Sequence, residues 1–447
     1  MKNEIAYIKI EQSLSLGGTV TVEGAKNSLL PILMASLLTR GISIIEHVPP
    51  LLDVYATIKL LEKYNVKINY DEYEKKIEIN SLYISPTIIA TEYFKKIRTS
   101  YFLASVSLLH FQEFWLGLPG GDKIGKRPID IHLNGFEAFG VSIHYHDDYI
   151  YLSAKTGLYP ATVFLSYPSV GATQNLLLLA SGISGKSVLY NAAQEPEVLD
   201  LIEVLRASGA KIELSFGGTI TVYGTQELKP FHHLVMPDRL EASTLLIAAA
   251  ISKGSIHIPN APAYAMGSII NHLKKMGNSI TVGPNQYGIT LDAAETQKNF
   301  DVKTMPYPGI STDYQSPLLA LMSIGKGQAT IHETVFENRM LHAFELNKMG
   351  AQITVESDYA KIKGAPELIG TTVYAHDIRA AAALILGGLA AYGTTKVFGL
   401  NHLLRGYHNL DKKLISLGAN ISFIEEKLET EENFYKKTET QLVEQAA

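Results

Sequence analysis

The sequence predicts an α/β protein of two domains, each made of three similar units of strands and helices. One short pattern recurs six times along the chain, at a spacing of about 70 residues. Alternating with it are alanine- and leucine-rich segments that have almost no polar face. At 447 residues the chain is long enough for two or three domains, each with its own core.

The recurring pattern is the end of an amphipathic helix, a small or glycine-containing turn, and a strand that begins at isoleucine. The copies read EKYNVKI, EAFGVSI, RASGAKI, KKMGNSI, NKMGAQI and SLGANI. Their last residues are Ile68, Ile143, Ile212, Ile280, Ile353 and Ile421. Glycine readily adopts the left-handed conformation that often follows a helix. An isoleucine in a run of alternating polar and apolar residues predicts a strand with one face in the core.

The other half of each unit also repeats. Strand-like openings lead into apolar helices, as in ATVFLSYPSVGATQNLLLLAS and TTVYAHDIRAAAALILGGLA, and a β-branched strand follows a glycine, as in GKSVLYNAA. Each unit therefore reads strand–helix–strand–helix–strand. We expect the first helix, which lacks a polar face, to be buried, and the second, which is amphipathic, to face solvent.

Six units of this size are too large for a solenoid repeat. The simplest packing is two globular domains of three units each, with the buried helices inside and the sheets outside. The polar tail after Ile424 lies outside the repeat, and we expect it to be a frayed helix or disordered.

Composition excludes several classes of function. The formal net charge is −5, so there is no overall basic field that would gather nucleic acid. Cysteine is absent, which excludes disulfides, thiolate catalysis and cysteine–zinc sites. The start MKNEIAYIKI lacks the apolar core of a secretory signal, and the small-apolar run 380–393 is too short to span a bilayer. We expect a soluble, cytoplasmic protein that does not bind membranes.

Basic residues occupy three equivalent loops that join an opening strand to an apolar helix: Lys26, Arg239 and Arg379. A cation at a helix N-terminus opposes the helix dipole, whereas the free N–H groups there favour anions. Acidic residues in the same loops, such as Asp238 and Asp313, can simply cap the helices. Three cations in equivalent loops favour a bound anion as their common reason.

The cluster HYHDD, from His144 to Asp148, has the residue types of a metal site. It lies between two strand-like segments, so a hairpin with Asp147 and Asp148 in its turn is the better interpretation. No metal site is predicted.

The segment LPGGDKIGKRPID, residues 118–130, combines a glycine pair with Asp122, Lys126 and Arg127. The glycines predict a mobile loop. Taken alone, the residues favour a solvated loop acid for Asp122.

Several motifs together resemble UDP-N-acetylglucosamine enolpyruvyl transferases. They are GAKNSLLPIL, LPGGDKIGKRPIDIHL, PSVGAT, PDRLEASTLLIAAAI, ETVFENRMLH, DIRAAAALI and RGYHNLDKKL, and the resemblance runs from about Gly17 to Ile424. The related shikimate-pathway enolpyruvyl transferases share the fold but not these motifs. The resemblance implies a two-domain, inside-out α/β barrel fold. Its first domain comprises residues 1–26 and 236–424 and its second residues 27–235, with residues 425–447 as a polar tail.

The resemblance implies transfer of enolpyruvate from phosphoenolpyruvate to the 3′-hydroxyl of UDP-N-acetylglucosamine, with release of phosphate, in peptidoglycan synthesis. It implies no metal or organic cofactor, and a monomer or weak homo-oligomer. Phosphoenolpyruvate is a compact trianion that needs several cations. By the resemblance, Lys26, Arg127 and Arg405 hold its phosphate, while Arg339 and Arg379 hold its carboxylate.

The remaining roles follow from the same resemblance. Asp313 matches the base that takes the proton of the sugar hydroxyl, and Asn27 and Arg98 match sugar and nucleotide contacts. The uracil-side loop is expected at Pro128, Ile129, Asp130, Ile131 and His132. The diphosphate side is expected at Ser169, Val170 and Gly171, and the substrate-binding set also includes Val335 and Asp377.

Asp122 matches the mobile-loop residue, which is cysteine in most of the family and aspartate in some members. Either residue can deliver a proton. The reference pKa of aspartic acid is about 3.9. Burial under a closed loop and the negative ligand would raise it, whereas Lys126 and Arg127 would lower it. Because the antibiotic fosfomycin alkylates the loop cysteine, the resemblance implies intrinsic resistance.

Four residues depart from the family on the acceptor side: Phe102, Tyr167, Leu52 and Tyr55. They leave two alternatives open, a related enzyme that uses another nucleotide acceptor and a non-catalytic nucleotide-sugar binder. The set Lys26, Arg127, Asp313 and Arg405 argues against the binder, because binding alone does not need it.

Overall fold

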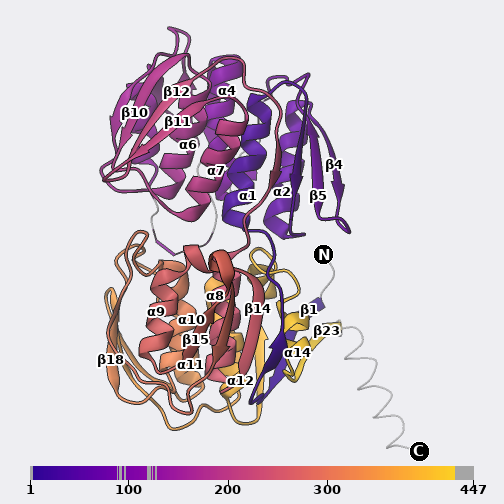
Figure 1. The fold of residues 1–447 in the computed structure, drawn as a ribbon, viewed down its shortest axis with the longest axis vertical. Helices are drawn as coiled ribbons and strands as arrows, with labels where there is room; N and C mark the ends of the chain where they lie inside the picture. The colour runs from indigo at the N-terminus through magenta and orange to yellow at the C-terminus, as the bar shows by residue number, and fades with distance from the viewer. Residues whose placement is uncertain are drawn as a thin grey trace, which may run out of the picture.

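The chain folds into two stacked lobes joined by two chain crossings (Figure 1). The computed structural model describes residues 4–427 except 88, 90–92, 95–96, 118–121, 123 and 126–127. We call residues 26–235 the central lobe and residues 4–25 with 236–427 the terminal lobe. Each lobe has its own buried apolar cluster, one running from Leu29 to Val235 and the other combining residues 8–22 with 240–421.

The central lobe carries three small sheets. Their strands are β3 (Ile42–Glu46), β4 (Lys67–Asp71), β5 (Lys76–Asn80), β6 (Glu113–Gly117), β7 (Ser142–Tyr145), β8 (Tyr149–Ser153), β9 (Thr162–Phe164), β10 (Gly185–Tyr190), β11 (Lys211–Ser215), β12 (Thr219–Gly224) and β13 (His232–Leu234). The strand orders are β13-β3-β5-β4, β6-β8-β7 and β11-β12-β10-β9. The helices are α1 (Lys26–Ala35), α2 (Leu52–Leu61), α4 (Leu103–Phe111), α5 (Asp130–Ala138), α6 (Val170–Ser181) and α7 (Pro196–Ala207), with short 3-10 turns at Ser36–Leu38, Glu62–Tyr64 and Arg98–Phe102.

The terminal lobe repeats this plan. Its strands are β1 (Glu4–Glu11), β2 (Gly17–Thr19), β14 (Ser255–Pro262), β15 (Ser279–Val282), β16 (Tyr287–Asp292), β17 (Val302–Lys303), β18 (Gln328–His332), β19 (Gln352–Glu356), β20 (Tyr359–Lys363), β21 (Thr372–Tyr374), β22 (Thr394–Phe398) and β23 (Ile421–Lys427). The sheets are β21-β22-β1-β23, β15-β16-β14-β2 and β17-β18-β20-β19. The helices are α8 (Arg239–Ile251), α9 (Gly267–Lys275), α10 (Thr312–Met322), α11 (Leu341–Lys348), α12 (Ile378–Ala390), α13 (Leu400–Leu403) and α14 (Leu410–Ser416), with 3-10 turns at Ala263–Ala265 and Pro284–Gln286.

Buried helices form the centre of each lobe and the sheets lie outside, as the sequence predicts. In the terminal lobe α8, α10 and α12 pack against one another, and in the central lobe α1, α4 and α6 do so. These helices lack a polar face because every side is covered. The second helices are amphipathic; α9, for example, buries Ile269, Ile270 and Leu273 and exposes lysines.

The six predicted isoleucines all lie in strands, namely β4, β7, β11, β15, β19 and β23. Each of these strands forms an antiparallel pair with a further strand, so the unit has one strand more than the predicted order. In the last unit that partner is β1, from the other end of the chain. Because of this pairing β23 continues to Lys427, beyond Ile424, where the tail was predicted to begin.

The two crossings exchange opening strands between lobes. The strand before α1, β2, pairs in parallel with β14 of the terminal lobe, and the strand before α8, β13, pairs with β3 of the central lobe. The crossings also hydrogen-bond to each other, since Ala25 N donates to Met236 O at 2.8 Å and Asp238 N donates to Glu23 O at 2.7 Å. This tie places the N-termini of α1 and α8 side by side where the lobes meet.

Two other predictions concern local features. The cluster His144 to Asp148 covers the end of β7 and the turn of the β7–β8 hairpin, with Asp147 and Asp148 in the turn, as predicted. Part of the predicted mobile loop, including Lys126 and Arg127, lies outside the described residues, as do residues 428–447 of the tail. No described helix is long and apolar enough to cross a membrane.

Candidate functional site

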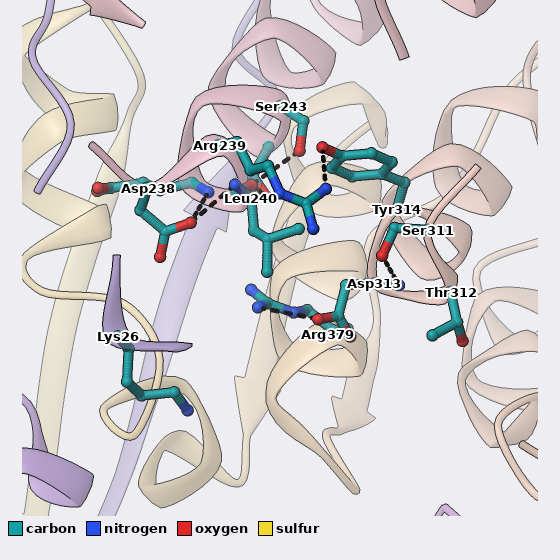
Figure 2. A network of polar contacts seen from close by, with 12 residues as sticks. Lys26, Asp238, Arg239, Leu240, Ser243, Ser311, Thr312, Asp313, Tyr314 and Arg379 are labelled. Carbon is teal, nitrogen blue, oxygen red and sulfur yellow. Dashed lines mark hydrogen bonds and ion pairs between the residues drawn. The ribbon is translucent and has the colours of Figure 1, made fainter. Parts of the chain in front are cut away.

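The N-termini of the buried helices in the terminal lobe point toward the interface and are capped by side chains. The Asp238 carboxylate accepts from Leu240 N at 2.7 Å and Ser311 Oγ accepts from Asp313 N at 3.2 Å (Figure 2). The Asp377 carboxylate accepts from Arg379 N at 2.8 Å. In the central lobe Ser169 caps α6 in the same way. Capping therefore accounts for these Asp and Ser side chains. Asp313 is the second residue of α10, so its carboxylate does not cap the helix and can make other contacts.

The Asp313 carboxylate lies between two arginines. Arg339 Nη2 is 2.5 Å from Asp313 Oδ1, and Arg379 Nη2 is 3.6 Å from Oδ2. Burial alone would raise the pKa of Asp313, but the guanidinium groups of Arg339 and Arg379 hold that pKa well below its usual range. Asp313 is therefore ionised at neutral pH, and a competing anion on the arginines would make it more basic.

Both arginines are held by neighbouring hydroxyl groups. Arg339 Nη1 donates to Thr312 Oγ1 at 2.9 Å, and Arg379 Nη1 donates to the Tyr407 hydroxyl at 2.8 Å. The Arg379 guanidinium also lies over the Tyr407 ring, with its central carbon 5.3 Å from the ring centroid. Both arginine side chains are buried, so their direction is fixed by these contacts.

Arg239, the third predicted cation, has a partner within the protein. Its Nε and Nη2 donate to the two oxygens of Glu197 at 2.9 and 3.2 Å, and its Nη1 donates to the Tyr314 hydroxyl at 2.9 Å. Sequence reasoning placed a bound anion here. The structure supplies a carboxylate from the other lobe instead.

A second ionic cluster joins the lobes around Arg405. Asp53, in the first turn of α2, accepts from Lys26 Nζ at 3.0 Å and from Arg405 Nε at 2.8 Å. Arg405 Nη1 also lies 2.5 Å from Asp122 Oδ1, and His402 Nδ1 lies 3.9 Å from the same oxygen. Burial would raise the pKa of Asp53, but Lys26 and Arg405 lower it. Two carboxylates thus neutralise the two cations.

A third group lies within the central lobe. The Arg98 guanidinium lies 5.2 Å from the Tyr101 ring centroid, and the Tyr101 ring meets His132 edge-on at 5.7 Å. Asn175 Nδ2 donates to His132 Nδ1 at 3.1 Å, and a Cβ placed at Gly171 would lie 3.4 Å from His132 Nε2. Burial, with a smaller effect from Arg98, lowers the pKa of His132 to about 3, so the imidazole is neutral.

The other predicted residues are spread around these clusters. Asn27 and the loop residues Pro128 and Asp130 are exposed. The half-exposed ones are Ile129, Ile131, Ser169, Val170, Gly171 and Val335. Arg127 lies outside the described residues. Of the acceptor-side departures, Phe102 is buried and Tyr55 is half-buried, while Leu52 and Tyr167 are exposed.

Sequence reasoning missed Asp53, Glu197, Tyr314 and Tyr407, which complete the clusters. The acids Asp53 and Glu197 each lie in the first turn of an amphipathic helix. An acid there interacts favourably with the helix dipole, so its presence does not indicate a binding site. Among the described residues, no group of three His, Asp or Glu side chains is placed to hold a metal ion.

Comparison with known proteins gives consistent results. The family described as EPSP synthase (3-phosphoshikimate 1-carboxyvinyltransferase) matches residues 10–414. The UDP-N-acetylglucosamine 1-carboxyvinyltransferase of Finegoldia magna is 41% identical over 94% of this chain and 99% of its own length. The UDP-N-acetylglucosamine 1-carboxyvinyltransferase 1 of Staphylococcus epidermidis is 44% identical over 91% of this chain and 96% of its own.

Solved structures show the same fold. The enolpyruvyl transferase NikO from Streptomyces tendae aligns with a TM-score of 0.86 at 24% identity, covering 94% of this chain and 99% of its own. EPSP synthase from Acinetobacter baumannii aligns with a TM-score of 0.75 at 18% identity, covering 94% and 100%. The predicted two-lobed fold is therefore confirmed.

Proposed function

Because the chain belongs to the EPSP synthase family and, within it, to the UDP-N-acetylglucosamine 1-carboxyvinyltransferases, we propose that it transfers the enolpyruvyl group of phosphoenolpyruvate to the 3′-hydroxyl of UDP-N-acetylglucosamine. Phosphate is the second product. The reaction is the first committed step of peptidoglycan precursor synthesis and takes place in the cytoplasm. The enzyme needs no metal or organic cofactor and acts as a monomer or weak homo-oligomer.

The observation that carries this proposal is the ionised Asp313 carboxylate between Arg339 and Arg379. The carboxylate of phosphoenolpyruvate competes with Asp313 for these two guanidinium groups, whose forks suit bidentate contacts. When the substrate takes the arginines, Asp313 loses the charges that lower its pKa. Substrate binding thus makes Asp313 a stronger base beside the group it deprotonates.

The phosphate of phosphoenolpyruvate binds at Lys26 and Arg405, with Arg127 as the third cation. Lys26 and Arg405 already converge on one carboxylate, that of Asp53, with N–O distances of 3.0 and 2.8 Å. Two cations that share a carboxylate are spaced to share a phosphate as well. Lys26 comes from the central lobe and Arg405 from the terminal lobe, so this site is complete only when the lobes, acting as domains, are together.

The chemistry is an addition followed by an elimination. The sugar 3′-oxygen attacks C2 of phosphoenolpyruvate as Asp313 takes its proton, and C3 gains a proton. The tetrahedral adduct then loses a proton from C3, the bond from C2 to the phosphate oxygen breaks, and phosphate leaves. Asp122, 2.5 Å from Arg405, lies beside the phosphate cations. We assign it to proton delivery: as the carboxylic acid it gives its proton to C3 and becomes the carboxylate that pairs with Arg405.

The nucleotide sugar binds along the central lobe. Arg98 and His132 line one side of this region, and the capped N-terminus of α6 at Ser169 to Gly171 offers backbone N–H groups to the diphosphate. The uracil-side loop is residues 128–132. Asn27, exposed beside Lys26, and Val335 and Asp377 of the terminal lobe complete the proposed contacts.

A second candidate is a related enzyme that uses another nucleotide acceptor. It is favoured by Tyr167, which is 39% exposed on the acceptor side and replaces a basic residue common in the family. A non-catalytic binder is disfavoured, because it would not need Asp313 held between two arginines.

The test is a phosphate-release assay with phosphoenolpyruvate and a panel of UDP-sugars, after dialysis against a chelator. We expect release with UDP-N-acetylglucosamine and little with UDP-glucose or UDP-galactose. Release with a different nucleotide acceptor alone would favour the second candidate, and no release with any acceptor would favour the binder.

A further inference from the structure

Arg239 and Glu197 form a buried ion pair across the two lobes. Glu197 is the second residue of α7 in the central lobe, and Arg239 is the first residue of α8 in the terminal lobe. The contact is bidentate, at 2.9 and 3.2 Å, and the side chains are 6% and 4% exposed. Glu197 takes the place of the anion that the sequence predicts at Arg239, and neither residue has a role in the proposed binding of phosphoenolpyruvate or nucleotide.

The third nitrogen of the same guanidinium contacts α10, the helix that carries Asp313. Arg239 Nη1 donates to the Tyr314 hydroxyl at 2.9 Å, and Figure 2 shows this bond above Asp313, the neighbouring residue on α10. The Tyr314 ring lies 5.6 Å from the guanidinium carbon and is buried. Arg239 therefore connects Glu197 of one lobe with the first turn of α10 in the other.

A second interlobe contact lies beside this pair. Tyr307 N donates to Glu195 Oε1 at 3.3 Å, and the Tyr307 ring lies 6.0 Å from the Arg239 guanidinium carbon. Gln174 of α6 donates to the backbone oxygen of Glu197, which fixes the start of α7. Arg239 thus lies among Glu197 and two tyrosines from one segment of the terminal lobe, residues 307–314.

The physical properties of a buried ion pair explain what this arrangement can do. Removing two charges from water offsets most of their attraction, so such a pair contributes little net stability but penalises any arrangement that leaves one charge buried alone. Here the two charges lie on different lobes, so the pair forms only when the lobes are together. We propose that the Glu197–Arg239 pair is an interlobe positioning device that, through Tyr314, orients the first turn of α10 and hence Asp313 when the lobes meet. This inference rests on the proposed role of Asp313.

The test compares Glu197→Gln and Tyr314→Phe with wild type. Glu197→Gln keeps the shape but removes the charge, and Tyr314→Phe keeps the ion pair but removes the hydroxyl that joins Arg239 to α10. Glu203→Gln is the matched control, since Glu203 lies on the same helix in an exposed pair with Arg206. Two readouts are measured: hydrogen–deuterium exchange of the peptide covering residues 311–317, and kcat with KM for phosphoenolpyruvate.

We expect faster exchange in residues 311–317 in both test variants. We also expect kcat to fall about 10- to 100-fold in Glu197→Gln, with a smaller change in KM, because misplacing a reacting group slows catalysis more than binding. Tyr314→Phe is expected to lose less, and Glu203→Gln to match wild type.

Wild-type exchange in residues 311–317 of both test variants would overturn the inference, as would unchanged kcat in both. Exchange does not depend on turnover. If wild type released no phosphate, the proposed function would fail, whereas the exchange data would still decide whether the pair orders the start of α10.

Discussion

The two ionic clusters at the lobe interface both pair carboxylates with cations, but they differ in composition and in architecture. Asp313 and its arginines, Arg339 and Arg379, all belong to the terminal lobe. The cluster of Lys26, Asp53, Asp122 and Arg405 draws its cations from both lobes.

The arginines of the two clusters also differ in burial. The arginines beside Asp313 are 4% and 6% exposed, whereas Arg405 is 20% exposed. The proposed base and the arginines for the substrate carboxylate are thus built within one lobe, whereas the proposed phosphate site is divided between two. The comparison teaches that the geometry of the base depends on one lobe, whereas phosphate binding depends on how the two lobes meet.

The largest effect is expected at the cluster within one lobe. Asp313→Asn keeps the size of the side chain but removes the group that accepts the proton, so kcat should fall by a factor of about 10² to 10⁴. Phosphate release measures kcat, and calorimetry measures phosphoenolpyruvate binding, which should persist because Arg339 and Arg379 remain. Asp147→Asn, in the exposed β7–β8 turn, is the control. Near-normal turnover in Asp313→Asn would assign the base elsewhere.

The divided cluster should respond in affinity as well as rate. Lys26→Ala and Arg405→Ala each remove a charge-assisted contact of about 1.5–3 kcal/mol, equivalent to roughly a 10- to 100-fold loss in kcat/KM for phosphoenolpyruvate. Each change also leaves Asp53 with one cation instead of two. Steady-state kinetics at varied phosphoenolpyruvate measures the loss, and circular dichroism checks the fold. Lys63→Ala, on the 3-10 turn after α2, is the control.

Asp122 offers a chemical test of the same cluster. A thiolate opens an epoxide readily, whereas a carboxylate is a far poorer nucleophile, and the chain has no cysteine that could substitute. Wild type should therefore stay active with fosfomycin. Asp122→Cys should keep activity and lose it progressively with the drug, because its sulfur forms a C–S bond as the epoxide C–O bond breaks. Mass spectrometry of both proteins checks for the adduct, and labelled wild type would contradict this account.

Asp122→Ala separates a chemical role from a purely ionic one. If Asp122 delivers a proton, turnover should fall sharply although Arg405 is freed of one carboxylate. If Asp122 only neutralises Arg405, inorganic phosphate should inhibit the variant more strongly while turnover remains. Phosphate inhibition and kcat, measured together, decide between these roles.

Much of this site could be predicted from the sequence because its cations lie at repeated positions. Lys26 and Arg379 stand out at helix N-termini, where a positive charge is unfavourable. The carboxylate partners of Lys26 and Arg239 could not be found in this way, because Asp53 and Glu197 occupy positions where acids are ordinary.

The fold shows the same division between local and distant signals. The 70-residue repeat predicts the buried helices and six strand starts from nearby residues. The exchange of β2 and β13 between lobes, and the pairing of β1 with β23, depend on contacts between distant segments. Such pairing leaves no local pattern, so the repeat alone predicts contiguous units. Only the family resemblance implied a domain that combines residues 1–26 with 236–424.

The smallest expected effect concerns stability and pH. Asp53 has a lowered pKa in the folded protein, so its contribution to stability is complete above its unfolded pKa of about 3.9 and is lost as pH falls further. At pH 7, Asp53→Asn should lower the free energy of unfolding, because Lys26 and Arg405 lose their shared anion. Near pH 3 the difference from wild type should shrink, because Asp53 of the unfolded chain is then largely protonated and must lose that proton to fold. Urea unfolding of both proteins at the two pH values measures it. A difference that stayed constant with pH would mean that Asp53 stabilises the interface by packing and hydrogen bonding rather than by charge. The cluster around Asp53 would then act as a fixed structural contact, like the arginines around Asp313, rather than as an exchangeable ionic site.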